Sequence, residues 1–237
     1  MDSSDIAVVV PVFGDAAAAE ALIRRIGAWP DQPRELVVVS ADSDAHLRAL
    51  CEARDCRYLQ SEPNRGAQLD RGARTCTSPV LWFLHADAVP SPASMGAIVS
   101  HLATGAEGGY FRFQFLGEPS YRKRFLQTLV NLRVELGGIP YGDQGLFVRR
   151  DAYLECGGFA HQPLFEEVSL VRTLRARGHF RGLKMSIAVA TRRWERDGWW
   201  RRSLANRRLA LCYLLGAPAE RLAADYERQS RTEGEPG

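Results

Sequence analysis

Short apolar runs alternate with amphipathic segments along the first half of the chain. The runs at 6–13, 35–39, 57–59 and 80–84 are rich in valine, leucine and aromatic residues, and they predict four strands. The segments between them predict helices at 15–29, 44–54 and 66–75, and Asp15 is placed to cap the first. Strands that alternate with helices indicate βαβ units. We therefore expect an α/β fold with a mostly parallel sheet and helices on both of its faces.

The second half of the chain continues with a more mixed pattern. Aromatic and polar residues alternate along 110–115, which predicts a strand with one buried face. Further strands are expected at 145–148 and 184–190, and helices at about 90–103, 120–136 and 165–177. From Trp199 onward the pattern is again helical, with a turn at 216–218.

Composition narrows the class of protein. Of the 237 residues, 46% are hydrophobic and 25% are charged, as in an ordinary globular domain. No apolar run approaches the roughly 20 residues that cross a bilayer, and the first apolar segment is too short and too acidic at its start for a signal peptide. The five cysteines form no C-x-x-C pair, so neither a zinc site nor a disulfide framework is expected. The cytoplasm is the simplest location.

The formal net charge of +3 hides an uneven distribution. Residues 172–208 contain 12 Lys or Arg against two acids, Glu195 and Asp197, so this segment carries +10 and the remainder −7. Such an excess suggests an anionic partner, which could be a phosphate, an anionic lipid surface or a nucleic acid. The alternative is a solvated basic face.

One motif joins a buried strand to a carboxylate. The apolar run at 80–84 leads directly into His85 and Asp87. In open α/β sheets, ligands bind just outside the carboxyl ends of the strands. A carboxylate there can hold a divalent cation, and the cation can hold a phosphate. The alternative is that Asp87 caps the next helix.

Six segments carry a resemblance to family 2 glycosyltransferases of the GT-A fold. They are VVPVF at 9–13, RGAQLDRG at 65–72, FLHAD at 83–87, YGDQG at 141–145, PLFEE at 163–167 and RRWER at 192–196. The chain resembles this family over residues 6–226, and more narrowly it is similar to the small bacterial transferases known as radical-SAM/selenodomain-associated. The resemblance implies transfer of a sugar from a nucleotide-diphosphate donor, with a divalent metal and inversion at the anomeric carbon.

On this resemblance the chain divides into functional parts. Residues 1–115 are expected to form the nucleotide-sugar-binding half of one GT-A domain, and residues 116–190 its acceptor-binding half. Residues 191–230 would be a basic and aromatic helical extension, and 231–237 a disordered tail.

The resemblance also assigns metal and phosphate contacts. The family carries an acid-x-acid triplet where this chain has His85 and Asp87, so Asp87 is implied as the ligand of Mg²⁺ or Mn²⁺. His85 could bind metal, contact phosphate or be structural. A helix N-terminus attracts phosphate. The residues implied around that helix start are Arg65, Gly66, Gln68 and Arg71, although Leu69 and Asp70 stand where the family has Arg and Asn.

The base-reading residue departs from the family pattern. Family members end the second strand with an Asp that reads the nucleobase, whereas this chain has Ser40 there and Asp42 two residues later. Either could bond to a uracil or ribose edge, or Asp42 or Asp44 could cap the next helix. We expect a UDP-sugar donor, with a GDP-sugar as the alternative. Pro11 and Phe13, in the first matched segment, are implied to line the donor site.

Further residues are implied for the sugar, the acceptor and the chemistry. Gly142, Asp143 and Gln144 form a tightly shaped loop with polar groups for the sugar or acceptor, or else ordinary turn chemistry. In the family, the second member of an acidic pair at a helix start is the catalytic base. That residue is Glu167 here, beside Glu166. A paired carboxylate can have a raised pKa, which suits a base. The alternative is that acids favour a helix N-terminus.

The C-terminal segment allows several partners. Trp194 resembles the family tryptophan that closes over the acceptor, and Arg192 or Arg193 could meet the diphosphate. Arginines and tryptophans around an amphipathic helix suit an anionic membrane surface. The alternative is a helix packed on its own domain or on a second subunit, as in a homodimer. The resemblance gives no role to a nucleic acid.

Two other functions remain open at this point. A sugar nucleotidyltransferase could be built on a similar sheet and would make, rather than consume, an activated sugar. A non-catalytic nucleotide-sugar-binding or membrane-docked partner protein is motivated by Ser40 and His85, which replace two family carboxylates.

Overall fold

The computed structural model describes residues 2–231, without the side chains of Ser3, Arg192, Arg193 and residues 227–231. One eight-stranded sheet has the order β3-β2-β1-β4-β7-β6-β8-β5. Its strands are β1 (Ile6–Val12), β2 (Glu35–Ser40), β3 (Arg57–Gln60), β4 (Val80–Phe83), β5 (Ala88–Val89), β6 (Gly108–Phe115), β7 (Phe147–Arg149) and β8 (Phe180–Val189). Strands β3, β2, β1 and β4 are parallel to one another, and β7 is antiparallel to both β4 and β6.

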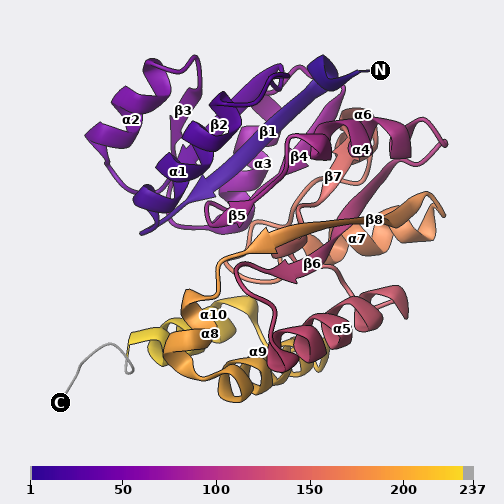
Figure 1. Ribbon diagram of the computed structural model, residues 1–237. Helices are drawn as coiled ribbons and strands as arrows, with labels where there is room; N and C mark the ends of the chain where they lie inside the picture. The colour runs from indigo at the N-terminus through magenta and orange to yellow at the C-terminus, as the bar shows by residue number, and fades with distance from the viewer. Residues whose placement is uncertain (1, 232–237) are drawn as a thin grey trace.

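Helices cover both faces of this sheet (Figure 1). They are α1 (Ala16–Gly27), α2 (Ala45–Glu52), α3 (Arg65–Thr75), α4 (Ala93–Leu102), α5 (Tyr121–Glu135), α6 (Arg150–Glu155), α7 (Glu167–Ala176), α8 (Arg192–Asp197), α9 (Trp199–Leu214) and α10 (Ala219–Arg231). Two 3₁₀ turns, η1 (Ser3–Asp5) and η2 (Gly142–Gln144), complete the structure. The predicted α/β architecture is confirmed.

Strand β1 shows why two layers of helices are needed. All seven of its residues are buried. Val8 and Val10 belong to a core with α1, α2 and α4, whereas Ala7 and Val9 belong to a second core with α3, α6 and α7. Because successive side chains of a strand point to opposite faces, a strand without polar positions must be covered on both sides.

The predicted helix caps are partly right. The Leu47 N–H donates to Asp44 Oδ1 at 2.9 Å, so Asp44 caps α2. The Ala67 N–H donates to Asn64 Oδ1 at 3.0 Å and makes Asn64 the cap of α3. Asp15 stands at the N-cap of α1, but its side chain accepts no capping hydrogen bond. The pattern missed β5, α6 and α8, which are all short.

The topology brings distant segments to one edge of the sheet. The carboxyl ends of β1 and β4 lie side by side because the strands are parallel neighbours. Strand β5 pairs Ala88 with Val189, which carries the segment after β4 to the end of β8. The loop that precedes β7 reaches the same edge because β7 runs in the opposite direction.

The C-terminal helices pack on this edge as part of the same body (Figure 1). Phe165 and Val168 form a cluster with Leu209 of α9 and Leu222 of α10. Phe115, at the end of β6, contacts the rings of Trp194 and Trp199 at centroid distances of 4.9 and 5.0 Å. The C-terminal extension therefore docks on its own domain. The predicted tail, 231–237, falls on residues whose side chains or backbone lie outside the described part of the chain.

Candidate functional site

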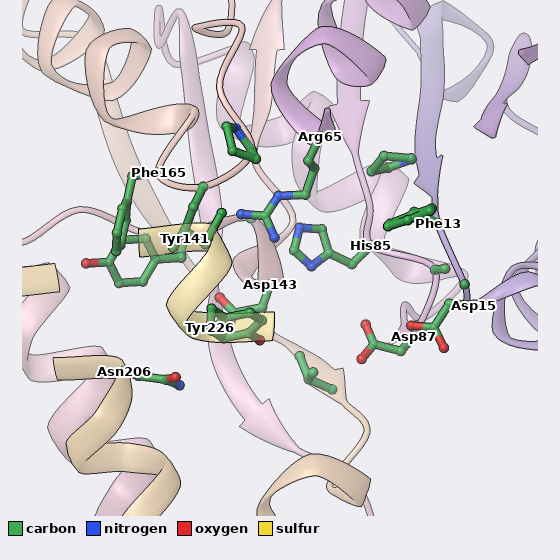
Figure 2. A pocket seen from close by; sticks show the side chains of 18 of the residues that line it. Phe13, Asp15, Arg65, His85, Asp87, Tyr141, Asp143, Phe165, Asn206 and Tyr226 are labelled. Carbon is green, nitrogen blue, oxygen red and sulfur yellow. The ribbon is translucent and has the colours of Figure 1, made fainter. Parts of the chain in front are cut away.

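A cavity of about 980 Å³ opens where these strand ends and the C-terminal helices meet. Arg65, His85 and Asp143 surround its middle, and Asp15 and Asp87 lie at the same end of it (Figure 2). Cavities of this size hold small-molecule ligands and cofactors. This volume lies near the upper end of the range for such pockets.

Asp87 lies at the end of the buried strand, as predicted. Strand β4 ends at Phe83, and the half-buried Asp87 lines the cavity four residues later. The capping alternative is wrong, because α4 begins at Ala93 and its N-cap residue is Pro92. Its carboxylate is thus placed to act on whatever occupies the cavity.

His85 packs against the loop before β7. A Cβ atom at Gly142 would lie 2.4 Å from His85 Nε2, so a side chain at 142 would displace the imidazole. Both residues line the cavity. The glycine is explained by this close contact with the histidine.

Glu167 presents a buried carboxylate to the cavity. It begins α7, is 1% exposed and lines the cavity wall. Among the described residues, none forms a hydrogen bond with its Oε2. Burial raises the pKa of Glu167 well above its usual value, and the neighbouring charge of Glu166 raises it further. A carboxyl group in this state can accept a proton near neutral pH.

Glu166 has a different role from its neighbour. It is fully buried, and both of its oxygens accept hydrogen bonds from Arg65, with Nη2 to Oε2 at 2.9 Å. Burial works against the charge of Arg65, but the attraction and hydrogen bonds of Glu166 raise the pKa of the guanidinium overall. Arg65 lines the cavity, but its guanidinium is engaged with Glu166, and its predicted contact with phosphate stays a prediction. The pair joins α3 to α7 across 101 residues of sequence.

We expect the substitution Arg65→Met to lower the free energy of unfolding by about 3 kcal/mol, because it leaves the carboxylate of Glu166 buried without its partner. The double variant Arg65→Met/Glu166→Gln should recover most of this loss. Urea denaturation at neutral pH measures both. The matched control is Arg24→Met, which breaks a surface i,i+4 pair with Glu20 and should cost much less than Arg65→Met. Equal losses in the two single variants would contradict this account of the Arg65–Glu166 pair.

Asp143 adds a second carboxyl group to the cavity. Burial raises the pKa of Asp143 to about 6, while Arg133 lowers it and the charge of Asp87 raises it. Asp87 and Asp143 are therefore close enough for the charge of one to disfavour the charge of the other. A cation between or beside them would relieve this repulsion.

The cavity fits a divalent cation that is held together with its substrate. Mg²⁺ and similar ions use one or two protein carboxylates, with substrate phosphates and water completing the coordination. Asp87 and Asp143 supply two such groups. Within the described part of the chain, no cluster of three His, Cys, Asp or Glu forms a preformed metal cage. The donor set thus matches a substrate-bridged ion better than a structural metal.

Several other predicted residues also line the cavity. They are Pro11, Phe13, Gln68, Gly142 and Trp194. The amide of Gln68 donates to Val12 O at 2.9 Å and Val39 O at 2.8 Å, so it ties together the ends of β1 and β2. Its nitrogen is therefore occupied by the protein itself.

Five of the predicted contact residues are not among those that line the cavity, although Asp42 contacts the lining residue Gly14. They are Ser40, Asp42, Gly66, Arg71 and Gln144. Ser40 bonds to the backbone of Asp42, and the Asp42 carboxylate accepts the Gly14 N–H at 2.6 Å. Arg71 is exposed, and the buried Gln144 donates to Phe111 O at 3.1 Å. The side chain of Arg193 lies outside the described residues.

The start of α3 is also occupied by the protein. A Cβ atom at Gly66 would lie 1.9 Å from Ala160 O, and the Gly66 N–H donates to Gln162 O at 3.2 Å. With Ala67 capped by Asn64, these two first-turn N–H groups already have partners. Gly66 therefore permits a close approach of the chain's own backbone, in place of the expected phosphate.

Sequence reasoning missed the wall supplied by the C-terminal helices. Arg202, Asn206 and Tyr226 line the cavity. Arg202 is 4% exposed, lies 4.4 Å from the ring centroid of Tyr226, and donates from Nη1 to Asp197 Oδ2 at 3.1 Å. A signal was present, because Arg202 falls on the same helix face as the apolar Leu209, where a charge is unusual.

Comparisons with known proteins agree with this geometry. The family model for glycosyl transferase family 2 matches residues 7–158. None of the curated protein sequences matches the chain.

Similar solved structures share the fold. Glucosyl-3-phosphoglycerate synthase (GpgS) from Mycobacterium tuberculosis, in complex with Mn²⁺, UDP-glucose and phosphoglyceric acid, is 20% identical with a TM-score of 0.57, over 78% of this chain and 71% of that one. The same enzyme with Mn²⁺, UDP and glucosyl-3-phosphoglycerate is 16% identical with a TM-score of 0.57, over 78% and 70%. S. aureus TarS 1–349 is 13% identical with a TM-score of 0.62, over 81% and 61%.

The family match covers well over half of the chain and includes the β4 end with Asp87. The narrower likeness to the radical-SAM-associated transferases stays a prediction. The sheet order, the cavity at the strand ends and the family match lead to one conclusion: this chain belongs to glycosyl transferase family 2 and is a glycosyltransferase.

Proposed function

We propose that this enzyme moves a sugar from a UDP-sugar to a hydroxyl group of an acceptor, with inversion at the anomeric carbon and with the help of a divalent cation. The observation that carries the proposal is Glu167, a buried carboxylate with a raised pKa in the same cavity as Asp87. The GpgS structures, whose complexes contain Mn²⁺ and UDP-glucose, support the choice of cation and donor.

Glu167 acts as the base in this proposal. Its carboxylate takes the proton of the acceptor hydroxyl while that oxygen bonds to the anomeric carbon. The bond from that carbon to the diphosphate breaks, and its electron pair leaves with UDP. Attack from the face opposite to the leaving group inverts the configuration.

Asp87 and Asp143 act on the leaving group. They would hold the divalent cation, which when bound offsets the negative charge that develops on the diphosphate. Burial and the charge of Asp87 raise the pKa of Asp143. A cation beside the two carboxylates would offset this repulsion and favour the charged form of Asp143.

The pair of Arg65 and Glu166 positions the base. Glu166 stands next to Glu167 at the start of α7, and its bonds to Arg65 fix this helix end against α3. The charge of Glu166 raises the pKa of Glu167, whereas the charge of Arg65 lowers it. The pair therefore tunes the basicity of Glu167 as well as its position.

The location is also a proposal. The five cysteines are all free thiols, and three of them are buried. Free thiols suit the reducing cytoplasm. We therefore place the enzyme in the cytoplasm.

The experiment is a panel of UDP- and GDP-sugars incubated with the full chain, with Mn²⁺ or with EDTA. We expect release of nucleoside diphosphate from one UDP-sugar, stimulated by Mn²⁺ and further by an acceptor. Pyrophosphate released from a nucleoside triphosphate and a sugar phosphate would instead identify a nucleotidyltransferase. Nucleotide-sugar binding without turnover over long incubation would identify a non-catalytic binding protein.

A further inference from the structure

Helix α5 has two apolar faces. Leu126 and Val130 pack into the core with Phe113 and Phe115 of β6. On the opposite face, large apolar side chains are exposed at Tyr121, Phe125 and Leu132, and at the C-cap residue Leu136. Spacings of 4, 7 and 4 residues keep these four on one side of a helix with a 3.6-residue period.

Helix α9 repeats this arrangement. Trp200, Leu204 and Leu211 are exposed, as is the C-cap residue Leu215, and these four have the same spacings of 4, 7 and 4 residues. The other face of α9 carries Leu209, which packs on α7 through the cluster with Phe165 and Val168. The exposed face is therefore not needed to hold the helix in place.

The two exposed stripes meet near the start of each helix. Phe125 of α5 contacts Trp200 of α9 with ring centroids 5.9 Å apart. Both helices lie at the same end of the molecule, remote from α2 and β3 (Figure 1). We call the eight residues of the two stripes the α5–α9 face. Leu136 is 78% exposed and Leu215 is 79% exposed, so water meets much of this apolar surface.

Basic residues border the α5–α9 face. Arg122 and Arg124 flank the α5 stripe, and Arg201, Arg207 and Arg208 are exposed along α9. Helix α9 contains no acidic residue, and the single acid of α5, Glu135, pairs with Arg112 at 3.0 Å. An apolar stripe bordered by arginines complements a surface that is apolar beneath a negatively charged layer.

We propose that the α5–α9 face docks on an anionic phospholipid bilayer, with both helices lying in the interface. Within the described residues, no helix has the length and apolarity to cross a bilayer, so the contact would be peripheral. The basic border favours a lipid surface over a second copy of the chain, which would bring like charges together. A role for α5 in this contact was not evident from the sequence.

Helix α9 lies between the proposed docking surface and the catalytic cavity. Arg202, Asn206 and Leu209 on its inner side line the catalytic cavity. Because a helix with its side chains is about 10–12 Å across, a docked bilayer would lie about one helix diameter from the cavity. An acceptor held at the lipid surface would thus have a short path to Glu167.

The test is flotation of the full chain with phosphatidylcholine vesicles, with and without phosphatidylglycerol. We expect binding to the anionic vesicles only, weakened as salt rises from about 0.1 M to about 0.5 M. The triple variant Arg201→Gln/Arg207→Gln/Arg208→Gln should bind about 100-fold more weakly. The double variant Leu136→Glu/Leu204→Glu should lose at least as much, since binding scales with buried apolar area.

Matched controls separate docking from general effects of charge and polarity. The variants Arg34→Gln/Arg54→Gln/Arg172→Gln and Leu154→Glu change exposed residues outside the α5–α9 face and should float like the wild type. Equal loss in face and control variants, or no flotation of the wild type, would overturn the proposal. Light scattering without lipid provides a further test. If the wild type is a dimer and Leu136→Glu/Leu204→Glu is a monomer, the face joins two copies of the chain and the proposal is overturned. Because flotation measures lipid binding, its result does not depend on whether the enzyme transfers sugar as proposed.

Discussion

The variant Glu167→Gln should transfer sugar about 10²- to 10⁴-fold more slowly than the wild type while still binding the nucleotide-sugar. Glutamine keeps the shape of the side chain but cannot take the acceptor proton. Initial rates of nucleoside diphosphate release, together with donor binding by calorimetry, separate the two effects. The matched control, Glu52→Gln, changes an exposed acid at the end of α2 and should leave both quantities unchanged.

The rate of sugar transfer should depend on pH through the ionisation of Glu167. Burial and the charge of Glu166 raise the pKa of Glu167, and the base must be ionised to work. The wild-type rate should therefore fall as the pH drops through this raised pKa, well above the usual range of a glutamate. Glu167→Gln should lose that acidic limb.

The contribution of Glu167 to stability should fall as the pH rises, whereas the rate of sugar transfer should rise. A carboxyl group whose pKa is raised by folding binds more protons in the folded state. Wild-type stability due to this group is then highest below the unfolded pKa and declines as the pH rises through the folded pKa. Glu167→Gln removes this cost, so its Tm at pH 8 should equal or exceed that of the wild type. An inactive variant that is also unstable, or one with wild-type turnover, would contradict the assignment of the base.

The variant Asp87→Asn should lose at least about 10³-fold in Mn²⁺-stimulated activity, since a cation at the diphosphate supplies several kcal/mol of charge stabilisation. Donor affinity should no longer depend on Mn²⁺. A second readout is Asp143, whose pKa of about 6 is raised in part by the charge of Asp87 and should fall in this variant.

The control for this prediction is Asp31→Asn, a change at an exposed loop residue outside the cavity, which should keep the Mn²⁺ response. The rate of nucleoside diphosphate release is measured against Mn²⁺ concentration for the wild type, Asp87→Asn and Asp31→Asn. If Asp87→Asn retains the wild-type response to Mn²⁺, the cation is held by other residues.

Local patterns predicted the parts of the site that follow from one segment. The apolar run of β4 placed Asp87 at a strand end, and the acidic pair placed Glu167 at the start of α7. In both cases the determining interactions lie within a few residues. The strand and helix periods are equally local, which explains why the layers were predicted well.

Contacts between distant segments escaped prediction. The partner of Glu166 is Arg65, and nothing in the sequence near either residue shows which of the many arginines pairs with Glu166. The same holds for Gly66, whose space is filled by Ala160, and for Arg202, which reaches the cavity only because α9 packs on α7. Such contacts depend on the complete chain packing.

A crystal structure of the enzyme with Mn²⁺ and a UDP-sugar tests the central claim most directly. We predict that Asp87 and Asp143 hold the cation beside the diphosphate, and that Glu167 faces the anomeric carbon from the side opposite to the diphosphate. A diphosphate bound outside this cavity, with Asp87 making no contact to the cation, would contradict the account.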